Sequence, residues 1–270
     1  MLGGFASMDQ QIINCFWLGL VQGMTEFLPI SSSGHLVLLQ KFFGIANNSM
    51  TLEVLLHVGS LIAVFACFWR RIINMILHPI KSELPLLVLA TIPLVPAALL
   101  FGDYFGEAFS GEYLGFAFLI TTLIFWLSDL VSGVAFETKQ VRWYNALVMG
   151  LMQVIALVPG ISRSGSTIAG GISTGLSRKR AADFAFLMSI PAILGSLVFD
   201  AKNIIDSGFD VAGGPMPLLV GMTASALFGF FSIKVMLKLI RRVRLPWFGL
   251  YTGVLGVLIL LDQYFFHLYF

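Results

Sequence analysis

Six stretches of the chain are almost entirely apolar and long enough to cross a membrane as helices. A bilayer-spanning helix needs about 20 mainly apolar residues. Two of the stretches are slightly shorter and contain prolines, which membrane helices tolerate better than soluble ones. The stretches cover residues 52–69, 84–101, 113–136, 181–199, 216–237 and 247–270. The pattern predicts an all-α polytopic membrane protein with six transmembrane helices.

Two further apolar segments, 11–45 and 144–177, are each interrupted midway by Pro, Ser and Gly. The interruptions are Leu28–Gly34 and Val158–Gly165. Irregular backbone that faces lipid would leave its N–H and C=O groups without partners, so each interruption must be shielded by protein or line a wet cavity. We therefore predict two re-entrant helix–loop–helix segments. Their second half-helices are expected at residues 35–45 and 166–176.

The two interrupted segments resemble each other when Gly19 is aligned with Gly150. In this alignment 19–34 matches 150–165 without gaps, and seven of the sixteen positions are identical, including Gln22 and Gln153. Three predicted crossings separate the copies, so the copies should enter the membrane from opposite faces. The sequence predicts an inverted repeat, approximately 11–101 and 144–237, within one membrane domain of residues 1–270. Interrupted helices at matching positions of such repeats indicate a binding site near the bilayer midplane.

The low charge content excludes an ordinary soluble enzyme and a nucleic-acid-binding protein. Only 11% of the residues are charged and 58% are hydrophobic, whereas roughly a quarter of a soluble domain is charged. The net charge is only +2, which provides no broad basic surface for nucleic acid. Cys15 and Cys67 lie in apolar runs and are expected to be buried thiols rather than a disulfide.

Basic residues are concentrated in the loops on one side of the predicted bundle. Loops 70–83, 137–180 and 238–246 hold twelve Lys and Arg residues without counting Arg163, whereas the opposite loops hold two. Because basic loops stay on the cytoplasmic side of a membrane, both termini are expected outside. No Lys or Arg precedes Lys41, so the first forty residues do not have the pattern of a cleaved signal peptide and are expected to be retained.

The interruptions carry the residues expected at an anion-binding site. A helix N-terminus offers free N–H donors and a partial positive charge, and nearby Gly and Ser residues let backbone and hydroxyl groups surround a phosphate. Arg163 supports this interpretation, because a guanidinium near mid-membrane costs roughly 2.5–3.5 kcal/mol and phosphate matches its donors bidentately. The alternative is a salt bridge from Arg163 to Glu26 or Asp129. The candidate substrate-binding residues are Ser31, Ser33, Gly34, Ser162, Ser164, Gly165 and Thr167.

The first interruption also carries groups that could perform catalysis. Gln22 and Glu26 are four residues apart and share a helix face, where an amide and a carboxylate suit a hard divalent cation, Mg²⁺ or Ca²⁺. Three serines at 31–33 are followed by His35, and a serine beside a histidine with a nearby carboxylate contains the parts of an activated nucleophile. Taken singly, such residues more often cap or pack helices. Their combination with Arg163 is the basis of the catalytic hypothesis.

Other polar residues within or beside the spans have simpler interpretations. Asp129 lies near the cytoplasmic end of its span and is expected to be structural. His57 and Glu53 are expected either to anchor at the interface or to support the site. Asp183 should complement the dipole of the helix that starts near it. Five basic residues form a cytoplasmic edge that signals orientation and contacts anionic lipid: Lys234, Lys238, Arg241, Arg242 and Arg244.

Two motifs resemble the signature sequences of the undecaprenyl-diphosphate phosphatases of the bacitracin-resistance type. The first is QGMTEFLPISSSGH at Gln22–His35, and the second is PGISRSGST at Pro159–Thr167. The stretches 52–64 and 177–195 are also similar, so the resemblance extends over nearly the whole chain. It implies an integral membrane enzyme with two re-entrant helix pairs and a divalent cation. Such an enzyme converts the isoprenoid carrier diphosphate to its monophosphate outside the cytoplasmic membrane, and so recycles the lipid used for cell-wall synthesis.

The resemblance also implies roles for individual residues. It places the metal-binding pair at Gln22 and Glu26, the nucleophilic or phosphate-binding serine at Ser32, the catalytic histidine at His35 and the phosphate-clamping arginine at Arg163. Many members of that type have Glu where this chain has Gln22. A neutral amide should bind a cation more weakly, which leaves Glu26 as the principal ligand. The resemblance leaves open whether Ser32 attacks phosphorus or His35 activates a water.

Hydrolysis has one alternative, the transport or flipping of a phosphorylated isoprenoid lipid, because inverted repeats with interrupted helices are typical of transporters. The other common type of membrane lipid phosphatase needs a second histidine soon after its Ser-Arg pair. The next histidine after Arg163 is His267, so that type is excluded. The expected partners are a lipid diphosphate and membrane lipids, and the sequence leaves a homodimer open. The expected location is the bacterial cytoplasmic membrane, with the active site facing outside.

Overall fold

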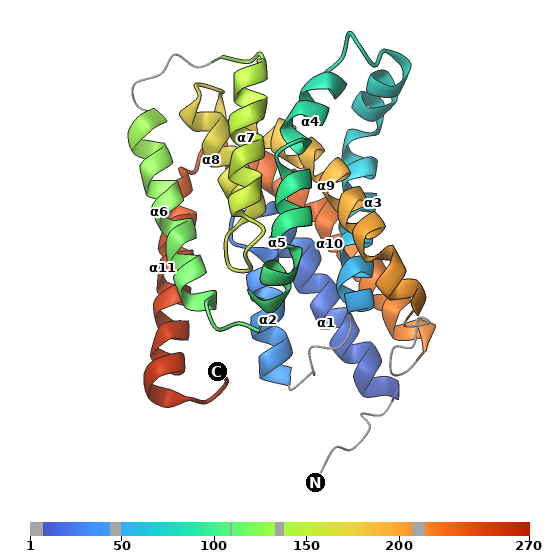
Figure 1. Cartoon of the computed structure of the whole chain (residues 1–270), viewed down its shortest axis with the longest axis vertical. Helices are drawn as coiled ribbons and strands as arrows, with labels where there is room; N and C mark the ends of the chain where they lie inside the picture. The colour runs from blue at the N-terminus through green and yellow to red at the C-terminus, as the bar shows by residue number, and fades with distance from the viewer. Residues whose placement is uncertain (1–7, 44–49, 109, 133–137, 207–213) are drawn as a thin grey trace.

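The chain forms a bundle of α-helices in a computed structural model that describes residues 8–43, 50–108, 110–132, 138–206 and 214–270 (Figure 1). In chain order the helices are α1 (Met8–Phe27), α2 (Ser32–Phe43), α3 (Met50–Leu77), α4 (Leu84–Thr91), α5 (Leu94–Ala108), α6 (Leu114–Ser132), α7 (Trp143–Ile155), α8 (Arg163–Ser173), α9 (Arg178–Asp206), α10 (Pro215–Leu239) and α11 (Leu245–Leu261). A short π-helix, η1 (Asp262–Phe266), follows α11.

Among the described residues, six segments are long and apolar enough to cross a membrane. They are Leu52–Leu77, Leu84–Gly102, Leu114–Val131, Arg178–Val198, Pro215–Leu239 and Leu245–Phe266. Large apolar side chains on these segments are exposed, for example Leu123, Trp126 and Leu130 on α6. An apolar surface of this extent fits contact with lipid rather than with water. The prediction of an all-α, multi-pass membrane protein is confirmed.

Two predicted spans differ from the structure in shape. The stretch 84–101 is predicted as one helix, but it is divided into α4 and α5, because Pro93 and Pro96 lack the N–H groups that would continue the helical hydrogen bonds. The last span is predicted to reach residue 270, yet α11 ends at Leu261. Asp262 accepts hydrogen bonds from the backbone N–H groups of residues 268–270 at 3.0, 3.0 and 3.1 Å, so the end of the chain folds back onto this carboxylate.

The two interrupted segments form helical hairpins that turn back inside the molecule. α1 leads into α2 through residues 28–31, and α7 leads into α8 through residues 156–162. In Figure 1, α1 and α2 occupy the lower half of the molecule, whereas α7 and α8 occupy the upper half. Both interruptions fall where the sequence predicts them. The arrangement is consistent with two re-entrant segments that enter a membrane from opposite faces.

Both second half-helices begin three residues earlier than predicted, at Ser32 and Arg163. The cause is serine capping. Ser31 Oγ accepts the N–H of Gly34 at 3.3 Å, and Ser162 Oγ accepts the N–H of Gly165 at 3.1 Å. Arg163 is therefore the first residue of α8. A cation at this end adds to the partial positive charge of the helix, so both favour a nearby anion.

Equivalent helices of the two halves start at positions that preserve the alignment of the two interruptions. The helix pairs α2 and α8, α4 and α10, and α6 and α11 begin at residues 32 and 163, 84 and 215, and 114 and 245. The last of these pairs begins beyond residues 101 and 237, the approximate ends predicted for the two repeats. The halves interlock, because α1 packs along α10 and α7 packs along α4. A Cβ at Gly19 would lie only 2.1 Å from the Gly221 carbonyl oxygen, so α1 and α10 touch through their backbones.

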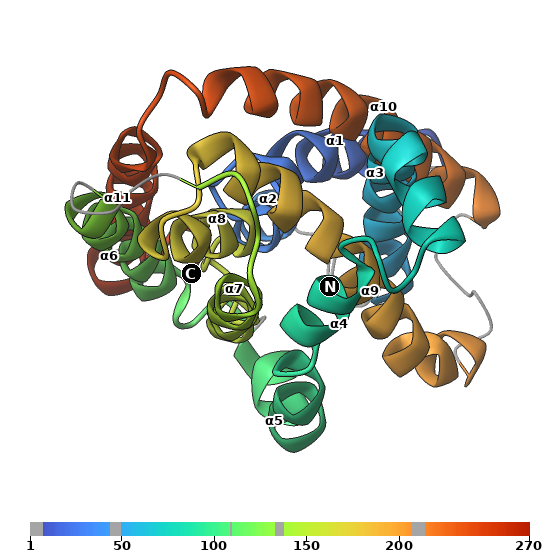
Figure 2. The same ribbon diagram turned by 90° about the horizontal axis from the view of Figure 1, so that it is seen from above.

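The hairpin tips lie in the interior of the bundle. Seen from above in Figure 2, α2 and α8 are near the centre, with α6 and α11 on one side and α3, α4 and α9 on the other. The largest cluster of buried apolar side chains includes Phe125, Phe184 and Phe186 and joins α6, α8 and α9. This packing shields the interrupted backbone, as the sequence argument requires.

Asp129 joins three elements at one end of the bundle, in agreement with its predicted structural role. Its Oδ1 accepts a hydrogen bond from Arg244 Nε at 3.0 Å and lies 3.8 Å from Arg178 Nη2. These contacts tie α6 to the starts of α9 and α11. Cys15 and Cys67 are free thiols; Cys15 is buried, as predicted, whereas Cys67 is only half-buried.

Candidate active site

The two interruptions meet where α1 ends and α8 begins. Arg163, at the start of α8, forms an ion pair with Glu26 on the last turn of α1, through Nη2 and Oε1. The Ser164 hydroxyl donates a hydrogen bond to the Leu28 carbonyl oxygen at 3.0 Å. Candidate residues that lie in separate halves of the sequence therefore form one site.

Glu26 is the centre of this site. Its side chain is only 2% exposed. Oε1 accepts from Arg163, and Oε2 accepts from Gln22 Nε2 at 3.0 Å and from the Ser32 hydroxyl. The structure thus brings together a carboxylate, a guanidinium, an amide and a hydroxyl. Phosphate, Glu26 and Asp129 were considered as partners for Arg163, and in the structure Arg163 pairs with the Glu26 carboxylate. The pairing balances two charges whose burial would otherwise be costly.

Gln22 presents an acceptor atom to which no described residue donates a hydrogen bond. Its Nε2 donates to Glu26 and lies 3.5 Å from Ser60 Oγ, which in turn lies 3.0 Å from Ser225 Oγ. Among the described residues, its Oε1 is buried and has no hydrogen-bond partner. A buried acceptor without a donor is destabilising. Because Nε2 is the amide atom that faces Glu26, a ligand held by both residues requires the amide to turn its oxygen toward the carboxylate.

The oxygen atoms of Gln22 and Glu26 fit the donor preference of a hard divalent cation. Mg²⁺ commonly takes only one or two carboxylates from the protein and completes its shell with water and substrate phosphate oxygens. Within the described parts of the chain, no group of three or more His, Cys, Asp or Glu residues could hold a metal ion. The residues present therefore suit a cation shared with a phosphate substrate rather than one enclosed by protein ligands.

His35 is held by its backbone and by a tyrosine from a distant helix. Its Nδ1 lies 2.7 Å from the Ser31 carbonyl oxygen, which can only accept, so Nδ1 carries the proton. Nε2 lies 2.7 Å from the Tyr251 hydroxyl on α11 and accepts from it in the neutral ring. Both nitrogens are engaged, so in this arrangement His35 is not hydrogen-bonded to Ser32.

Tyr251 is a site residue that the sequence argument missed. Its ring also stacks on His35, with ring centroids 5.8 Å apart and planes 6° apart. In the sequence it is one aromatic residue within the apolar stretch 247–270. The only local signal was its hydroxyl within an apolar stretch. A hydroxyl alone does not indicate that its partner is His35, which lies 216 positions earlier in the chain.

The second interruption is fixed by a residue on α6. Gly160 has a φ of +96°, a conformation that favours glycine. Its carbonyl oxygen accepts from the Thr121 hydroxyl at 2.9 Å, and the same hydroxyl accepts the Ser162 N–H at 3.1 Å. A Cβ at Gly34 would lie 3.0 Å from Gly160 Cα, so the two interruptions pack directly against each other. Thr121 was also missed, because nothing local in an apolar span points to this contact.

The remaining candidate residues occupy different environments. Thr167 is 1% exposed, and its hydroxyl donates to the Arg163 and Ser164 carbonyl oxygens within α8, at 2.8 and 3.0 Å. It supports the helix turn that carries Arg163. Ser33 is half-buried, with its hydroxyl 3.4 Å from that of Ser31. Ser31 itself adopts φ +69°, which is uncommon for a serine and marks the sharp start of α2.

His57 lies beside Glu26. Its Nε2 is 4.0 Å from Glu26 Oε2, and its Nδ1 donates to the Glu53 carbonyl oxygen at 2.8 Å. Glu53 in turn accepts from Gln40 at 2.9 Å, which links α3 to α2. His57 and Glu53 were expected either to anchor the helix at the membrane interface or to support the site. These contacts favour support of the site.

The fold and the site define a class of integral membrane protein in which two helical hairpins, one from each half of the chain, meet around a buried ion pair of Glu26 and Arg163. Residues 15–258 of the chain match the family described as "Bacitracin resistance protein BacA". This match covers most of the sequence. The chain belongs to this family.

Curated relatives are similar over nearly the full length of the chain. The undecaprenyl-diphosphatase of Carboxydothermus hydrogenoformans is 44% identical over 249 residues, which cover 91% of this chain and 95% of that protein. The undecaprenyl-diphosphatase of Halothermothrix orenii is 37% identical, with coverage of 93% and 98%. The undecaprenyl-diphosphatase of Methanosphaera stadtmanae is 36% identical, with coverage of 92% and 96%.

Proposed function

We propose that the protein hydrolyses undecaprenyl diphosphate to undecaprenyl phosphate and inorganic phosphate, and so recycles the lipid carrier of cell-wall synthesis. The observation that carries this proposal is the meeting of Arg163 with Glu26 and Ser32. The site combines a guanidinium that can bind the diphosphate, a serine hydroxyl that can attack phosphorus, and a carboxylate that can accept the proton of this hydroxyl. The names of the relatives support the substrate and favour hydrolysis over transport.

In the proposed first step, Ser32 attacks the terminal phosphorus. The Ser32 hydroxyl already donates to Glu26 Oε2, so its proton passes to that carboxylate as the oxygen–phosphorus bond forms. The bond from phosphorus to the bridging oxygen breaks, and undecaprenyl phosphate leaves. Arg163 and the N–H groups at the starts of α2 and α8 stabilise the negative charge that develops on the phosphoryl oxygens.

In the proposed second step, water cleaves the phosphoserine and releases inorganic phosphate. His35 is the base proposed for this water. Its protonated Nδ1 leaves a lone pair on Nε2, which faces the Tyr251 hydroxyl. Displacement of that hydroxyl by water would place the attacking oxygen at Nε2.

We propose Mg²⁺ or Ca²⁺ as the cofactor, held by the carboxylate of Glu26 and the amide oxygen of Gln22. When bound, the cation would neutralise charge on the diphosphate oxygens. Among the described residues Gln22 Oε1 is buried without a hydrogen-bond partner, which supports this assignment if the amide turns its oxygen toward Glu26. The neutral amide supplies less charge than a second carboxylate would, so a modest affinity is expected.

The purified protein in detergent should release phosphate from undecaprenyl diphosphate in the presence of Mg²⁺. We expect a chelator to abolish phosphate release, because the negative charge of the diphosphate would then repel the attacking oxygen. Added Mg²⁺ or Ca²⁺ should restore the release. Phosphate is measured colorimetrically over time. The His35→Ala variant should lose most activity, whereas His78→Ala, on an exposed turn between α3 and α4, should retain it. Intact lipid binding with no phosphate release would favour transport and overturn the proposal.

We also propose that the protein lies in the bacterial cytoplasmic membrane with its active site open to the outside. The basic loop between α3 and α4 lies at the upper end of Figure 1, and α1 begins at the lower end, which supports the predicted orientation. The first hairpin, which carries Ser32 and His35, is in the lower half.

This orientation is tested by labelling a cysteine on intact cells. In a background that carries Cys15→Ala and Cys67→Ala, a cysteine at Ser33 should react with a membrane-impermeant thiol reagent added outside. A cysteine at Lys139, in a basic loop, should react only after the cells are permeabilised. The opposite pattern would show that the orientation is inverted.

A further inference from the structure

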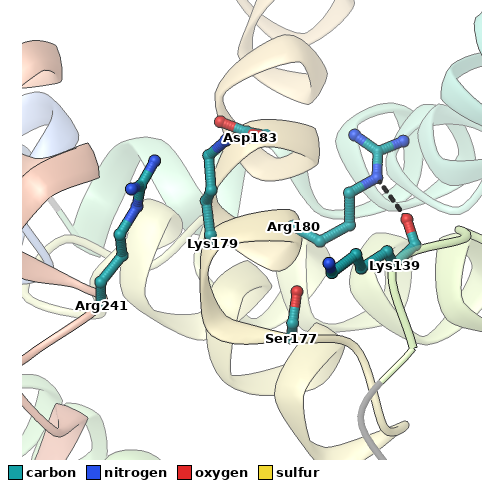
Figure 3. Close-up of a pocket in the computed structure, with 6 residues that line it drawn as sticks. All are labelled: Lys139, Ser177, Lys179, Arg180, Asp183 and Arg241. Atoms are coloured by element: carbon teal, nitrogen blue, oxygen red, sulfur yellow. Dashed lines mark hydrogen bonds between the residues drawn. The ribbon is translucent and has the colours of Figure 1, made fainter.

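A cavity outside the site around Glu26 has four cations among its six lining residues. It has a volume of about 360 Å³ and lies among the connection before α7, the start of α9 and the end of α10 (Figure 3). Its lining residues are Lys139, Ser177, Lys179, Arg180, Asp183 and Arg241. We call it the basic pocket. None of its residues belongs to the site around Glu26, and α8, which is 11 residues and thus about 16 Å long, separates the pocket from Arg163.

The basic pocket brings cationic side chains to the start of α9, where the helix dipole already provides a partial positive charge. Lys139, Lys179, Arg180 and Arg241 face a single carboxylate, that of Asp183. α9 begins with Arg178, Lys179 and Arg180 and has no acidic residue in its first turn, although that end of a helix carries a partial positive charge. Asp183, together with the ion pair of Arg180 with Glu83, therefore compensates only part of this positive charge.

The pocket is held in shape by contacts of Arg180. Its Nε donates to the Lys139 carbonyl oxygen at 3.0 Å, and its guanidinium pairs with Glu83, which also pairs with Arg71. The Ser177 backbone N–H donates a hydrogen bond of 2.9 Å to the Thr138 carbonyl oxygen, which joins the two walls. Figure 3 shows Lys179 and Arg241 on one side and Arg180 and Lys139 on the other. The side chains of Lys139, Lys179 and Arg241 are exposed and keep their donors available to a ligand.

We propose that the basic pocket binds a phosphate group, carried either by a phospholipid headgroup of the adjacent leaflet or by free inorganic phosphate. Phosphate oxygens accept charge-assisted hydrogen bonds from Lys and Arg. Basic pockets between helices on the side of the basic loops are typical sites for anionic headgroups. The volume exceeds that of one phosphate ion, so it accommodates a phosphate with part of a headgroup or with bridging water. A basic loop that served only as an orientation signal would need neither a cavity nor fixed walls.

The test compares two double variants with the same loss of charge. Lys179→Gln with Arg241→Gln removes two pocket cations, whereas Lys238→Gln with Arg242→Gln removes two exposed cations on the same edge that do not line the pocket. Both are made in the full chain carrying Arg163→Ala, so that phosphate binding at the catalytic site does not contribute. The thermal unfolding midpoint is followed in neutral detergent with increasing inorganic phosphate or phosphatidylglycerol. Chloride of equal ionic strength and phosphatidylcholine serve as blanks.

We expect at least one of the two ligands to stabilise the matched control, with an apparent affinity at least about tenfold weaker in the pocket variant. A response to phosphatidylglycerol alone would identify a lipid headgroup, and a response to inorganic phosphate would identify the free anion. Equal responses of the two double variants, or no response to either ligand, would overturn the proposal. Lys179→Glu is a second variant: it should weaken binding further, while phosphate release by the chain with Arg163 intact stays unchanged.

Discussion

Replacing Arg163 with alanine is expected to lower phosphate release from undecaprenyl diphosphate by about 10³-fold or more. The guanidinium stands at the first position of α8 and contacts Glu26 through Nη2. Arginine has five N–H donors, so further donors can reach phosphate oxygens. Among the described residues, Arg163 is the only arginine or lysine that forms an ion pair with Glu26, so its loss removes this permanent positive charge. The assay is turnover at saturating and at limiting substrate.

The same change also leaves Glu26 buried beside fewer donors. Removing one partner of a buried ion pair can cost about 3–5 kcal/mol of stability, so loss of activity alone would not distinguish chemistry from folding. Arg163→Lys separates the two, because it keeps a cation near Glu26 but loses the planar, bidentate geometry that phosphate requires. We expect Arg163→Lys to unfold close to the wild-type temperature and still to lose at least about tenfold in kcat/KM. If a folded Arg163→Ala protein keeps turnover within about tenfold of wild type, Arg163 is only a structural ion-pair partner.

The features that the sequence predicts well are local in origin. Prolines and glycines at residues 28–34 and 158–165 interrupt a helix whatever the rest of the chain does, and both interruptions appear in the structure. The six long apolar stretches likewise depend only on length and composition, and all six form candidate spans. The alignment of Gly19 with Gly150 is a property of the sequence itself, and the starts of three helix pairs, α2 and α8, α4 and α10, and α6 and α11, follow the same register.

The features that the sequence predicts poorly depend on side-chain geometry. The predicted starts of α2 and α8 lie three residues too late, because Ser31 and Ser162 each fold back onto a glycine N–H, and this choice of cap is not fixed by composition. The last predicted helix is too long, because a single carboxylate, Asp262, collects the final backbone donors. In each case one hydrogen-bonding side chain decides where a helix begins or ends.

The site itself shows the same limit at longer range. The motifs supply Glu26, Ser32, His35 and Arg163, but nothing in them says that Glu26 contacts Ser32 and Arg163 while His35 contacts Tyr251. Tyr251 comes from a helix outside both motifs and is visible only in three dimensions. The pairing matters for mechanism, because it makes the carboxylate rather than the histidine the neighbour of the Ser32 hydroxyl.

That pairing leads to a second large effect, in the Ser32→Ala variant. If Ser32 attacks phosphorus, as proposed, its removal should lower turnover on the order of 10³-fold or more. Ser189→Ala is the matched control, because this buried serine on α9 donates only to the Phe186 carbonyl oxygen at 2.7 Å, and its removal leaves no buried donor without a partner. The control should retain activity, and both variants should unfold close to the wild-type temperature. Ser32→Ala turnover within about tenfold of wild type would contradict attack by Ser32 and favour a water activated at His35.

The covalent intermediate provides an independent readout of the same step. With substrate labelled in its terminal phosphate, acid-quenched wild-type protein should carry label on Ser32 in the steady state, and the His35→Ala variant should carry more, because the proposed base for hydrolysis of the phosphoserine is missing. Ser32→Ala should carry none. Since Glu26 accepts the Ser32 proton, Glu26→Gln should prevent labelling rather than increase it. Labelling of Glu26→Gln equal to that of wild type would therefore exclude the carboxylate as the base for Ser32, even if Ser32 proved to be the nucleophile.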